Sequence, residues 1–143
     1  MKDGSKNFIL DSEIFTNTPS EIAKSVFYYV QDVGYYCCGK GHVTDRVGLK
    51  SIALLLTLSG KAFLKYRNKK HVLKAGDAFI INCIDHHVYG TEGTEEWEFK
   101  YLHFYGNNCD DIFELIYQMY GAVLLNSRKK SKLEGVLDKL INE

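Results

Sequence analysis

The sequence predicts a mainly β domain, built as a sandwich or barrel of short strands and followed by helices. Nine of the twelve glycines lie between residues 34 and 106, where they separate short apolar runs from one another. Apolar residues recur at helical spacing only after Asn108. Two kinds of architecture therefore follow one another along the chain.

The glycine-rich part of the chain contains eight runs that favour β-strands. Turn residues separate most of them: Ser59 and Gly60 interrupt two apolar runs, residues 67–70 make a polar hairpin tip, and Gly76 tolerates a positive φ. Many short strands at this spacing are typical of a sandwich or a barrel. In chain order, the expected strands are residues 26–30, 33–38, 51–58, 61–66, 71–73, 77–81, 87–90 and 96–105.

The last of these strands has one strongly aromatic face. Side chains alternate across a strand, so every second residue from 97 to 105 lies on the same side. That side carries Trp97, Phe99, Tyr101, His103 and Tyr105. We expect this face to form the wall of a cavity.

Two amphipathic helices are expected after the strands. The first begins near Asn108 or Asp110, either of which can cap it, and ends at Gly121. The second follows the basic run at residues 128–132. The apolar seam of the first is Ile112, Leu115, Ile116 and Met119, and that of the second is Leu133, Val136, Leu137, Leu140 and Ile141.

Length and charge exclude several classes of protein. A chain of 143 residues is one domain with a sizeable core. Its 18 basic and 18 acidic side chains cancel, so its net charge does not attract nucleic acid or anionic lipid. No apolar run has the length of a signal peptide or membrane span, and we expect a cytoplasmic protein without a membrane partner. The four cysteines lack Cys-x-x-Cys spacing and are interpreted as small apolar residues.

The sequence lacks the usual signatures of catalysis. No nucleophile elbow, phosphate loop or dinucleotide fingerprint occurs. A metal centre in a small barrel needs converging ligands, typically two histidines one residue apart on a strand, and the chain has no His-x-His. His86 and His87 are adjacent, so only one of them can point inward from a strand. We therefore expect no catalytic residue, no metal and no cofactor.

Five segments follow one another along the chain: LLLTLSGKA at 54–62, LKAGDAFII at 73–81, HVY at 87–89, EWEF at 96–99 and LHFYG at 102–106. In this order and spacing they resemble the N-terminal effector-binding and dimerisation domain of AraC-type transcriptional regulators. The resemblance covers about half of the chain, from residue 34 to residue 106, and continues more loosely through both helices.

The resemblance implies a cupin-like double-stranded β-helix, a jelly-roll barrel, followed by two C-terminal α-helices that pair two subunits. It implies a division into an N-terminal arm (1–20), a ligand-binding barrel (21–106) and a helical dimerisation segment (107–143). It also implies that a DNA-binding domain with two helix-turn-helix motifs follows where this chain ends. The chain would then be the sensory part of a longer regulator, and DNA would be a partner only through that further domain.

This chain departs from the metal-binding cupins. Ala53 stands where they carry a glutamate, and the His-x-His pair is missing, so only His87 remains of their ligand set. These departures agree with the expected absence of a metal.

The resemblance and the strand pattern together select candidate site residues. Ligand contacts are expected from a guanidinium that can grip a carboxylate or vicinal hydroxyls, from polar side chains of the barrel and from aromatic platforms for a sugar ring. These residues are Arg46, His87, Tyr89, Trp97, Tyr101 and His103. The homodimer seam is expected to use Ile112, Ile116, Met119, Leu133, Leu137 and Leu140.

The sequence thus predicts a non-enzymatic sensor that binds a small, sugar-like effector, forms a homodimer and regulates transcription through an attached DNA-binding domain. One alternative is a metal-dependent cupin isomerase or oxygenase that uses His42, His87 and His103. Another is a carbohydrate-binding module that acts without DNA.

Overall fold

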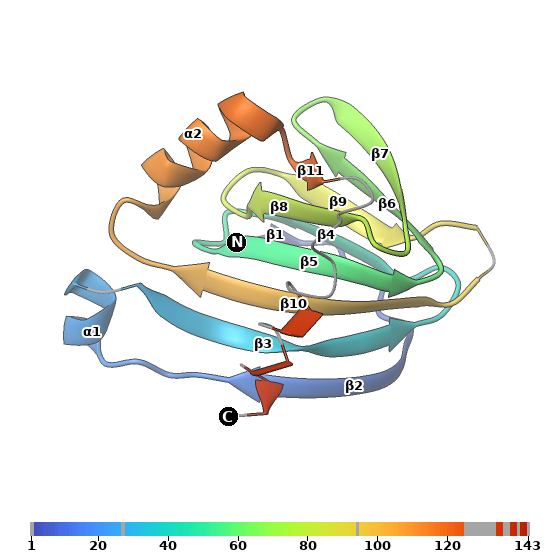
Figure 1. Cartoon of the computed structure of the whole chain (residues 1–143), viewed down its shortest axis with the longest axis horizontal. Coiled ribbons are helices and arrows are strands. Elements are labelled where there is room, and N and C mark those ends of the chain that lie inside the picture. Colours follow the sequence, from blue (N-terminus) through green and yellow to red (C-terminus); the bar gives the residue numbers. More distant parts are fainter. Residues whose placement is uncertain are drawn as a thin grey trace.

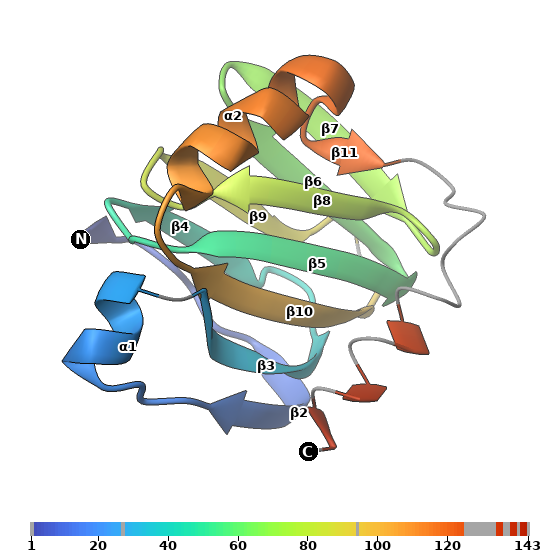
Figure 2. The same cartoon turned by 60° about the vertical axis from the view of Figure 1, so that its left-hand side comes forward.

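The computed structural model describes residues 2–26, 28–93 and 95–124, together with the pairs 134–135, 138–139 and 141–142. Within these residues, eleven strands pair antiparallel in two sheets that face each other (Figure 1). The view in Figure 2 shows the two sheets stacked as the layers of a barrel. The predicted mainly β sandwich or barrel is confirmed.

The first sheet has five strands and the second has six. The order in the first is β1 (Lys2–Asp3), β4 (Val43–Val47), β9 (His87–Thr91), β6 (Lys61–Tyr66) and β7 (Lys69–Lys74). The order in the second is β11 (Val123–Leu124), β8 (Ala78–Asn82), β5 (Ile52–Ser59), β10 (Trp97–Tyr105), β3 (Tyr29–Cys38) and β2 (Ile9–Thr16). Two helices complete the fold, α1 (Glu21–Val26) and α2 (Cys109–Tyr120).

The core lies between the facing sides of the two sheets. Strand alternation sends every second side chain inward, as in β6, where Leu64 is fully buried and its neighbours Phe63 and Lys65 are not. Trp97, Phe79 and Leu55 fill the centre of the same cluster. Burying large apolar side chains on both sheets stabilises the sandwich.

The N-terminal third of the fold differs from the expected strands. Residues 26–30 and 33–38 do not form two strands, because β3 runs without interruption from Tyr29 to Cys38 and Val26 ends α1. Gln31 and Asp32 lie between the two expected strands. In the structure, Gln31 donates a hydrogen bond to the Lys50 carbonyl oxygen at 2.8 Å and stays in the strand. Strands β2 and β4 were not expected at all.

The hairpin of β6 and β7 turns more tightly than expected. Only Arg67 and Asn68 form its tip, both with positive φ (47° and 64°), whereas Lys69 and Lys70 already belong to β7. Two central residues with positive φ give the turn geometry that matches the twist of a hairpin.

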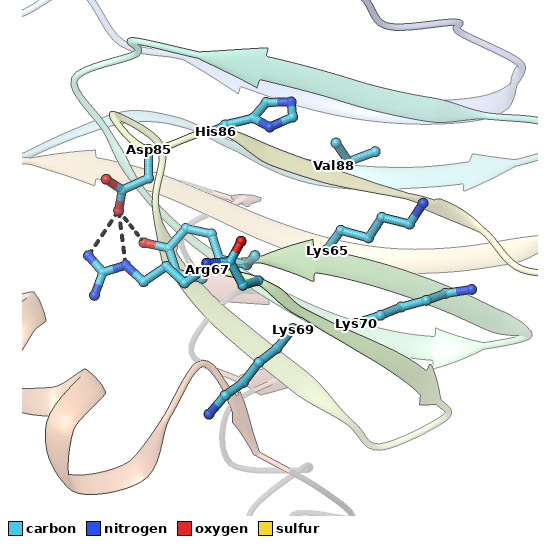
Figure 3. A pocket seen from close by; sticks show the side chains of 9 residues that line it. Lys65, Arg67, Lys69, Lys70, Asp85, His86 and Val88 are labelled. Carbon is cyan, nitrogen blue, oxygen red and sulfur yellow. Dashed lines mark hydrogen bonds and ion pairs between the residues drawn. The ribbon is translucent and has the colours of Figure 1, made fainter.

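Arg67 attaches α2 to this hairpin. Its guanidinium bridges the carboxylates of Asp85 and Glu114, and Figure 3 shows the first of these contacts. The same guanidinium lies 4.5 Å from the ring centre of Tyr117 and 5.3 Å from that of Phe113. Charged hydrogen bonds and cation–π contacts on one side chain therefore hold the helix against the barrel.

Helix α2 matches the first predicted helix. Cys109 and Phe113 are its buried residues, and Gly121 ends it with a φ of 73°. Asn108 occupies the N-cap position, yet its side chain makes no capping hydrogen bond, because its φ of 66° differs from the β-region backbone that capping requires.

Of the two expected C-terminal helices, α2 is the one that the structure gives as an element; residues 134–135, 138–139 and 141 are helical, and the residues between them lie outside the described ranges. Most of the predicted seam, namely Leu133, Val136, Leu137 and Leu140, lies outside the described residues. Nearby, Lys100 pairs with Glu134 and Asp138, and Ile141 packs on the outer face of the second sheet.

All four cysteines are buried and free, as expected for small apolar residues. They are Cys37, Cys38, Cys83 and Cys109. No helix in the described part of the chain has the length and apolar character needed to cross a membrane.

Candidate functional site

A cavity of about 200 Å³ lies inside the barrel, between the inner faces of the two sheets. Most of its lining side chains can donate or accept hydrogen bonds, and the N-terminal segment forms part of the wall. The lining residues are Asp3, Ser5, Asn7, Ile9, Asp32, Tyr36, His42, Thr44, Arg46, Tyr89, Phe99, Tyr101 and His103.

Strands β3 and β10 form an aromatic wall of the cavity. Their antiparallel register pairs Phe99 with Tyr36, and Tyr101 with Gly34. The rings of Tyr36 and Tyr101 are stacked, with centroids 5.3 Å apart and planes 8° apart, and Phe99 lies 5.6 Å from Tyr36. A stacked aromatic surface beside hydrogen-bonding groups suits a ligand with one apolar face and many hydroxyl groups.

Arg46 supplies the positive charge of the cavity. One of its terminal nitrogens donates a hydrogen bond to the Tyr89 hydroxyl at 3.3 Å, whereas its buried Nε has no partner. Within the described residues, Arg46 forms no ion pair. A guanidinium with free donors in a buried site favours a ligand that offers acceptor oxygens.

Asp32 of β3 is the carboxyl group that the second sheet contributes to the cavity lining. Burial raises the pKa of its carboxyl, while the Tyr101 hydroxyl and the Arg46 charge act in the opposite direction. The cavity therefore holds both a carboxyl group that accepts hydrogen bonds and a guanidinium that donates them, which is the pairing that a polyhydroxylated ligand can satisfy.

The two histidines that line the cavity, His42 and His103, are neutral near pH 7. Burial lowers the pKa of His103 to about 3, and its Nδ1 lies 2.8 Å from the Ser51 hydroxyl. Burial also lowers the pKa of His42, whose Nδ1 accepts a hydrogen bond from the Phe8 amide at 3.1 Å. Neutral rings do not compete with Arg46 for an anionic group.

His87 is fully buried next to Arg46 in the register of β4 and β9. Its Nδ1 lies 2.9 Å from the Asp85 carbonyl oxygen, which can only accept, so Nδ1 carries the proton. Burial lowers the pKa of His87 to about 4, so the ring is neutral near pH 7. Its Nε2 is thus a buried acceptor, and it has no partner in the described structure.

Four of the six candidate ligand contacts line the cavity: Arg46, Tyr89, Tyr101 and His103. The other two do not. His87 is fully buried and does not belong to the lining. Trp97 is also fully buried, and its Nε1 donates a hydrogen bond to the Thr57 hydroxyl at 3.2 Å. The ring centroids of Trp97 and Phe99 are 4.2 Å apart, so Trp97 is part of the core.

Sequence reasoning missed several lining residues. Asp32 was placed in a break between strands, although on a continuous β3 it shares the inward face with Gly34 and Tyr36. Thr44 was missed because β4 was not expected, and with Asp45 between Thr44 and Arg46 the strand shows no alternation of polar and apolar residues. The N-terminal lining residues are Asp3, Ser5, Asn7 and Ile9. Their sequence showed no pattern typical of a binding site, and they were predicted only as part of an N-terminal arm.

The predicted dimer residues on α2 lie in two different surroundings, one exposed to solvent and one facing a groove. Met119 is 70% exposed. Ile112 and Ile116 line an apolar groove of about 260 Å³ between α2 and the second sheet. Leu133, Leu137 and Leu140 lie outside the described residues.

Among the described residues, no cluster of three or more His, Cys, Asp or Glu side chains is arranged to hold a metal ion. His42 and His103 line the same cavity, and His87 does not.

Comparison with known proteins gives one family match. The family described as AraC-like ligand binding domain matches residues 31–143. No curated protein sequence matches the chain significantly.

Solved structures with a similar fold include three bacterial proteins. The cupin domain of an XRE family transcriptional regulator from Enterobacter cloacae aligns with 15% identity and a TM-score of 0.51, over 67% of this chain and 98% of that one. An HTH_3 family transcriptional regulator from Vibrio cholerae aligns with 18% identity and a TM-score of 0.51, over 68% of this chain and 53% of that one. The protein YhaK from Escherichia coli aligns with 12% identity and a TM-score of 0.56, over 68% of this chain and 45% of that one. At these identities the likeness shows the fold, and the aligned part spans about half of the second and third proteins.

Proposed function

The chain belongs to the family of AraC-like ligand-binding domains, and from this we propose that it is the effector-sensing domain of a transcriptional regulator. In this proposal, the barrel binds a small, sugar-like metabolite without changing it chemically. Occupancy of the barrel controls an attached DNA-binding domain. The fold that the chain shares with parts of two bacterial transcriptional regulators supports the sensing role.

The observation that carries the proposal is the cavity inside the barrel, whose lining includes Arg46. At about 200 Å³ the cavity is smaller than the roughly 300–1,000 Å³ typical of pockets for drug-sized ligands, so we propose a ligand of monosaccharide size. The hydroxyls of such a ligand both donate and accept, which suits Asp32 and Arg46 together. The stacked rings of Tyr36 and Tyr101 would cover the apolar face of its ring.

We propose that the N-terminal segment responds to the ligand. Asp3, Ser5, Asn7 and Ile9 line the cavity, so a bound effector would contact this segment directly. A ligand that binds one arrangement of the segment better than another shifts the population by that difference in affinity.

A row of side chains across the first sheet offers a route from the cavity to α2. Asp3, Arg46, His87 and Tyr66 are successive cross-strand neighbours on β1, β4, β9 and β6. Tyr66 makes an edge contact with Phe113 of α2, with ring centres 6.3 Å apart. We propose that this row couples the occupied cavity to the helix.

We propose that α2 contributes to a homodimer. Four large apolar side chains are between 44% and 70% exposed on this helix, and burying them against a second copy would remove apolar surface from water. They are Ile112, Leu115, Met119 and Tyr120.

Thermal unfolding with a panel of monosaccharides, uronic acids and polyols tests the proposal. A ligand that binds only the folded state raises the midpoint by mass action. We expect one compound to raise the unfolding midpoint of the wild type and, by the same amount, that of the matched surface variant Lys40→Met. The same compound should leave the midpoint of Arg46→Met unchanged. Mass spectrometry of the hit after incubation should return it unchanged. If Arg46→Met and Asp32→Asn both keep the full shift, the cavity is not the binding site.

A further inference from the structure

The hairpin of β6 and β7 carries an unbalanced positive charge. Residues 61–74 contain six basic side chains and no acidic one, although the whole chain has 18 of each. Arg67 is engaged by Asp85 and Glu114, which leaves the five lysines of the hairpin.

Four of these lysines and two apolar residues form a regular surface on the outer side of the first sheet. The register sets Lys61 opposite Lys74, Phe63 opposite Val72, and Lys65 opposite Lys70. All four lysines are exposed, and Val72 is 53% exposed. Four residues along a strand span about 13 Å, so two lysine pairs about 13 Å apart enclose an apolar centre. We call these six residues the lysine face.

The amines of the lysine face are largely without counter-charges. Lys65 and Lys70 each lie 5.8 Å from the centre of the Phe63 ring, and Figure 3 shows the two side chains extending in the same direction. In the described part of the chain, Lys61, Lys65 and Lys70 form no ion pair, and Lys74 reaches Asp77 only at 3.7 Å. Like charges directly opposite each other destabilise a strand pair, so this arrangement lowers the stability of the hairpin.

Protection of a sheet edge explains only part of this arrangement. Strand β7 is the edge of the first sheet, and lysines on an edge strand discourage pairing with other chains. Strand β6 lies inside the sheet between β9 and β7, so Lys61 and Lys65 guard no edge. Their like-charged pairing therefore needs another reason.

The surface continues into a hollow at the hairpin end. A space of about 530 Å³ lies beside Lys65 and Lys70 and reaches Val88 of β9 and His86 (Figure 3). The imidazole of His86 is held by Asp45 at 2.7 Å, so the acid nearest this hollow on β4 is already paired. The hollow is thus lined by Val88 and several basic side chains, and the one carboxylate in its lining, Asp85, is paired with Arg67.

We propose that the lysine face docks an acidic segment of a partner protein, which adds as an extended strand along the free edge of β7. Main-chain hydrogen bonds to the edge would hold the segment. On its lysine-facing side, the segment would present an apolar residue to Val72 and Phe63, with Asp or Glu two residues before and after it. The exposed apolar centre with a charged rim matches a protein partner better than a phosphate backbone.

Fluorescence anisotropy with the labelled peptide Thr-Glu-Thr-Val-Thr-Glu-Thr tests the proposal. We expect the wild-type protein to bind this peptide, and to bind the same peptide with glutamine in place of glutamate at least tenfold more weakly. The double variant Lys65→Glu/Lys70→Glu should lose at least tenfold in affinity. It keeps a like-charged cross-strand pair, so its fold stability is matched to that of the wild type.

Two controls separate this site from general charge attraction. Lys40→Glu/Lys50→Glu makes the same change in net charge on exposed lysines elsewhere and should bind as the wild type does. Phe63→Ser leaves the charge unchanged and should weaken binding several-fold. The proposal is overturned if the glutamate peptide does not bind at millimolar concentration, or if both double variants lose affinity equally. It is also overturned if Phe63→Ser binds normally, or if a 16-base-pair DNA duplex binds in place of the peptide.

Discussion

Two buried histidines are expected to make the stability of this domain fall steeply in mild acid. Burial lowers the pKa of His87 to about 4 and that of His103 to about 3, from an ordinary value of 6.5. Below pH 6.5 the unfolded chain binds protons at both residues and the folded chain does not, so protonation favours unfolding. The stabilising contribution is complete above pH 6.5 and is lost as the pH falls towards the folded-state values.

The size of the effect follows from these pKa values. Between pH 7 and pH 5 each histidine accounts for about 2 kcal/mol of unfolding free energy, and the pair for about 4 kcal/mol. Urea denaturation at the two pH values, followed by the fluorescence of the single tryptophan, Trp97, measures the difference directly.

Substitution assigns the effect to particular residues. His87→Asn and His103→Asn should each reduce the difference between pH 7 and pH 5 by about 2 kcal/mol, because each removes one titrating ring. Leu55→Ala, a core substitution without an ionisable group, should lower stability by similar amounts at both pH values. Should the two histidine variants keep the wild-type difference, the reasoning from buried neutral imidazoles is wrong.

Three further predictions concern the surface and the sheets. Met119→Asp should turn a dimer into monomers in sedimentation velocity. Gln118→Asp, on the same helix, should leave the measured mass unchanged. If the dimer survives Met119→Asp, this face of α2 is not the dimer interface. Lys65→Glu should stabilise the fold by about 0.2–1 kcal/mol in urea denaturation, because it creates an opposite-charge pair with Lys70, and a loss of stability would contradict the like-charge argument. Gly34→Ala should destabilise by about 2 kcal/mol or more, since the added Cβ would lie 2.3 Å from a carbonyl oxygen of β2, and an unchanged unfolding midpoint would show that β2 yields freely.

Sequence patterns predicted the barrel best where strands are buried on one face. The bounds of β6 were predicted without error, since Ala62, Leu64 and Tyr66 alternate with exposed residues. Strand β2 could not be predicted in this way. All eight of its residues are exposed, so its sequence does not alternate between buried apolar and exposed polar positions. Its pairing with β3 depends on contacts distant in sequence, which local patterns do not contain.

The candidate site was predictable to the extent that it lies on regular strands. The inward face of β10 was predicted from its alternation, and it supplies Tyr101 and His103 to the cavity. The depth of each residue was not predictable. Trp97 lies on the same face but is fully buried, packed against Tyr89 and Phe99. Asp32 was hidden by its polarity, which resembles that of a turn.

The burial of all four thiols gives the protein a practical property. Burial raises the pKa of Cys38 and of Cys83 to about 12, and it also raises the pKa of Cys37 and Cys109, so the reactive thiolate form is scarce at neutral pH. A cysteine introduced on the surface would then be the fast-reacting thiol of the chain. Spin labels or fluorophores placed singly on α2 or on the N-terminal segment can therefore report the spacing of two subunits, and any movement on effector binding, in the otherwise native sequence.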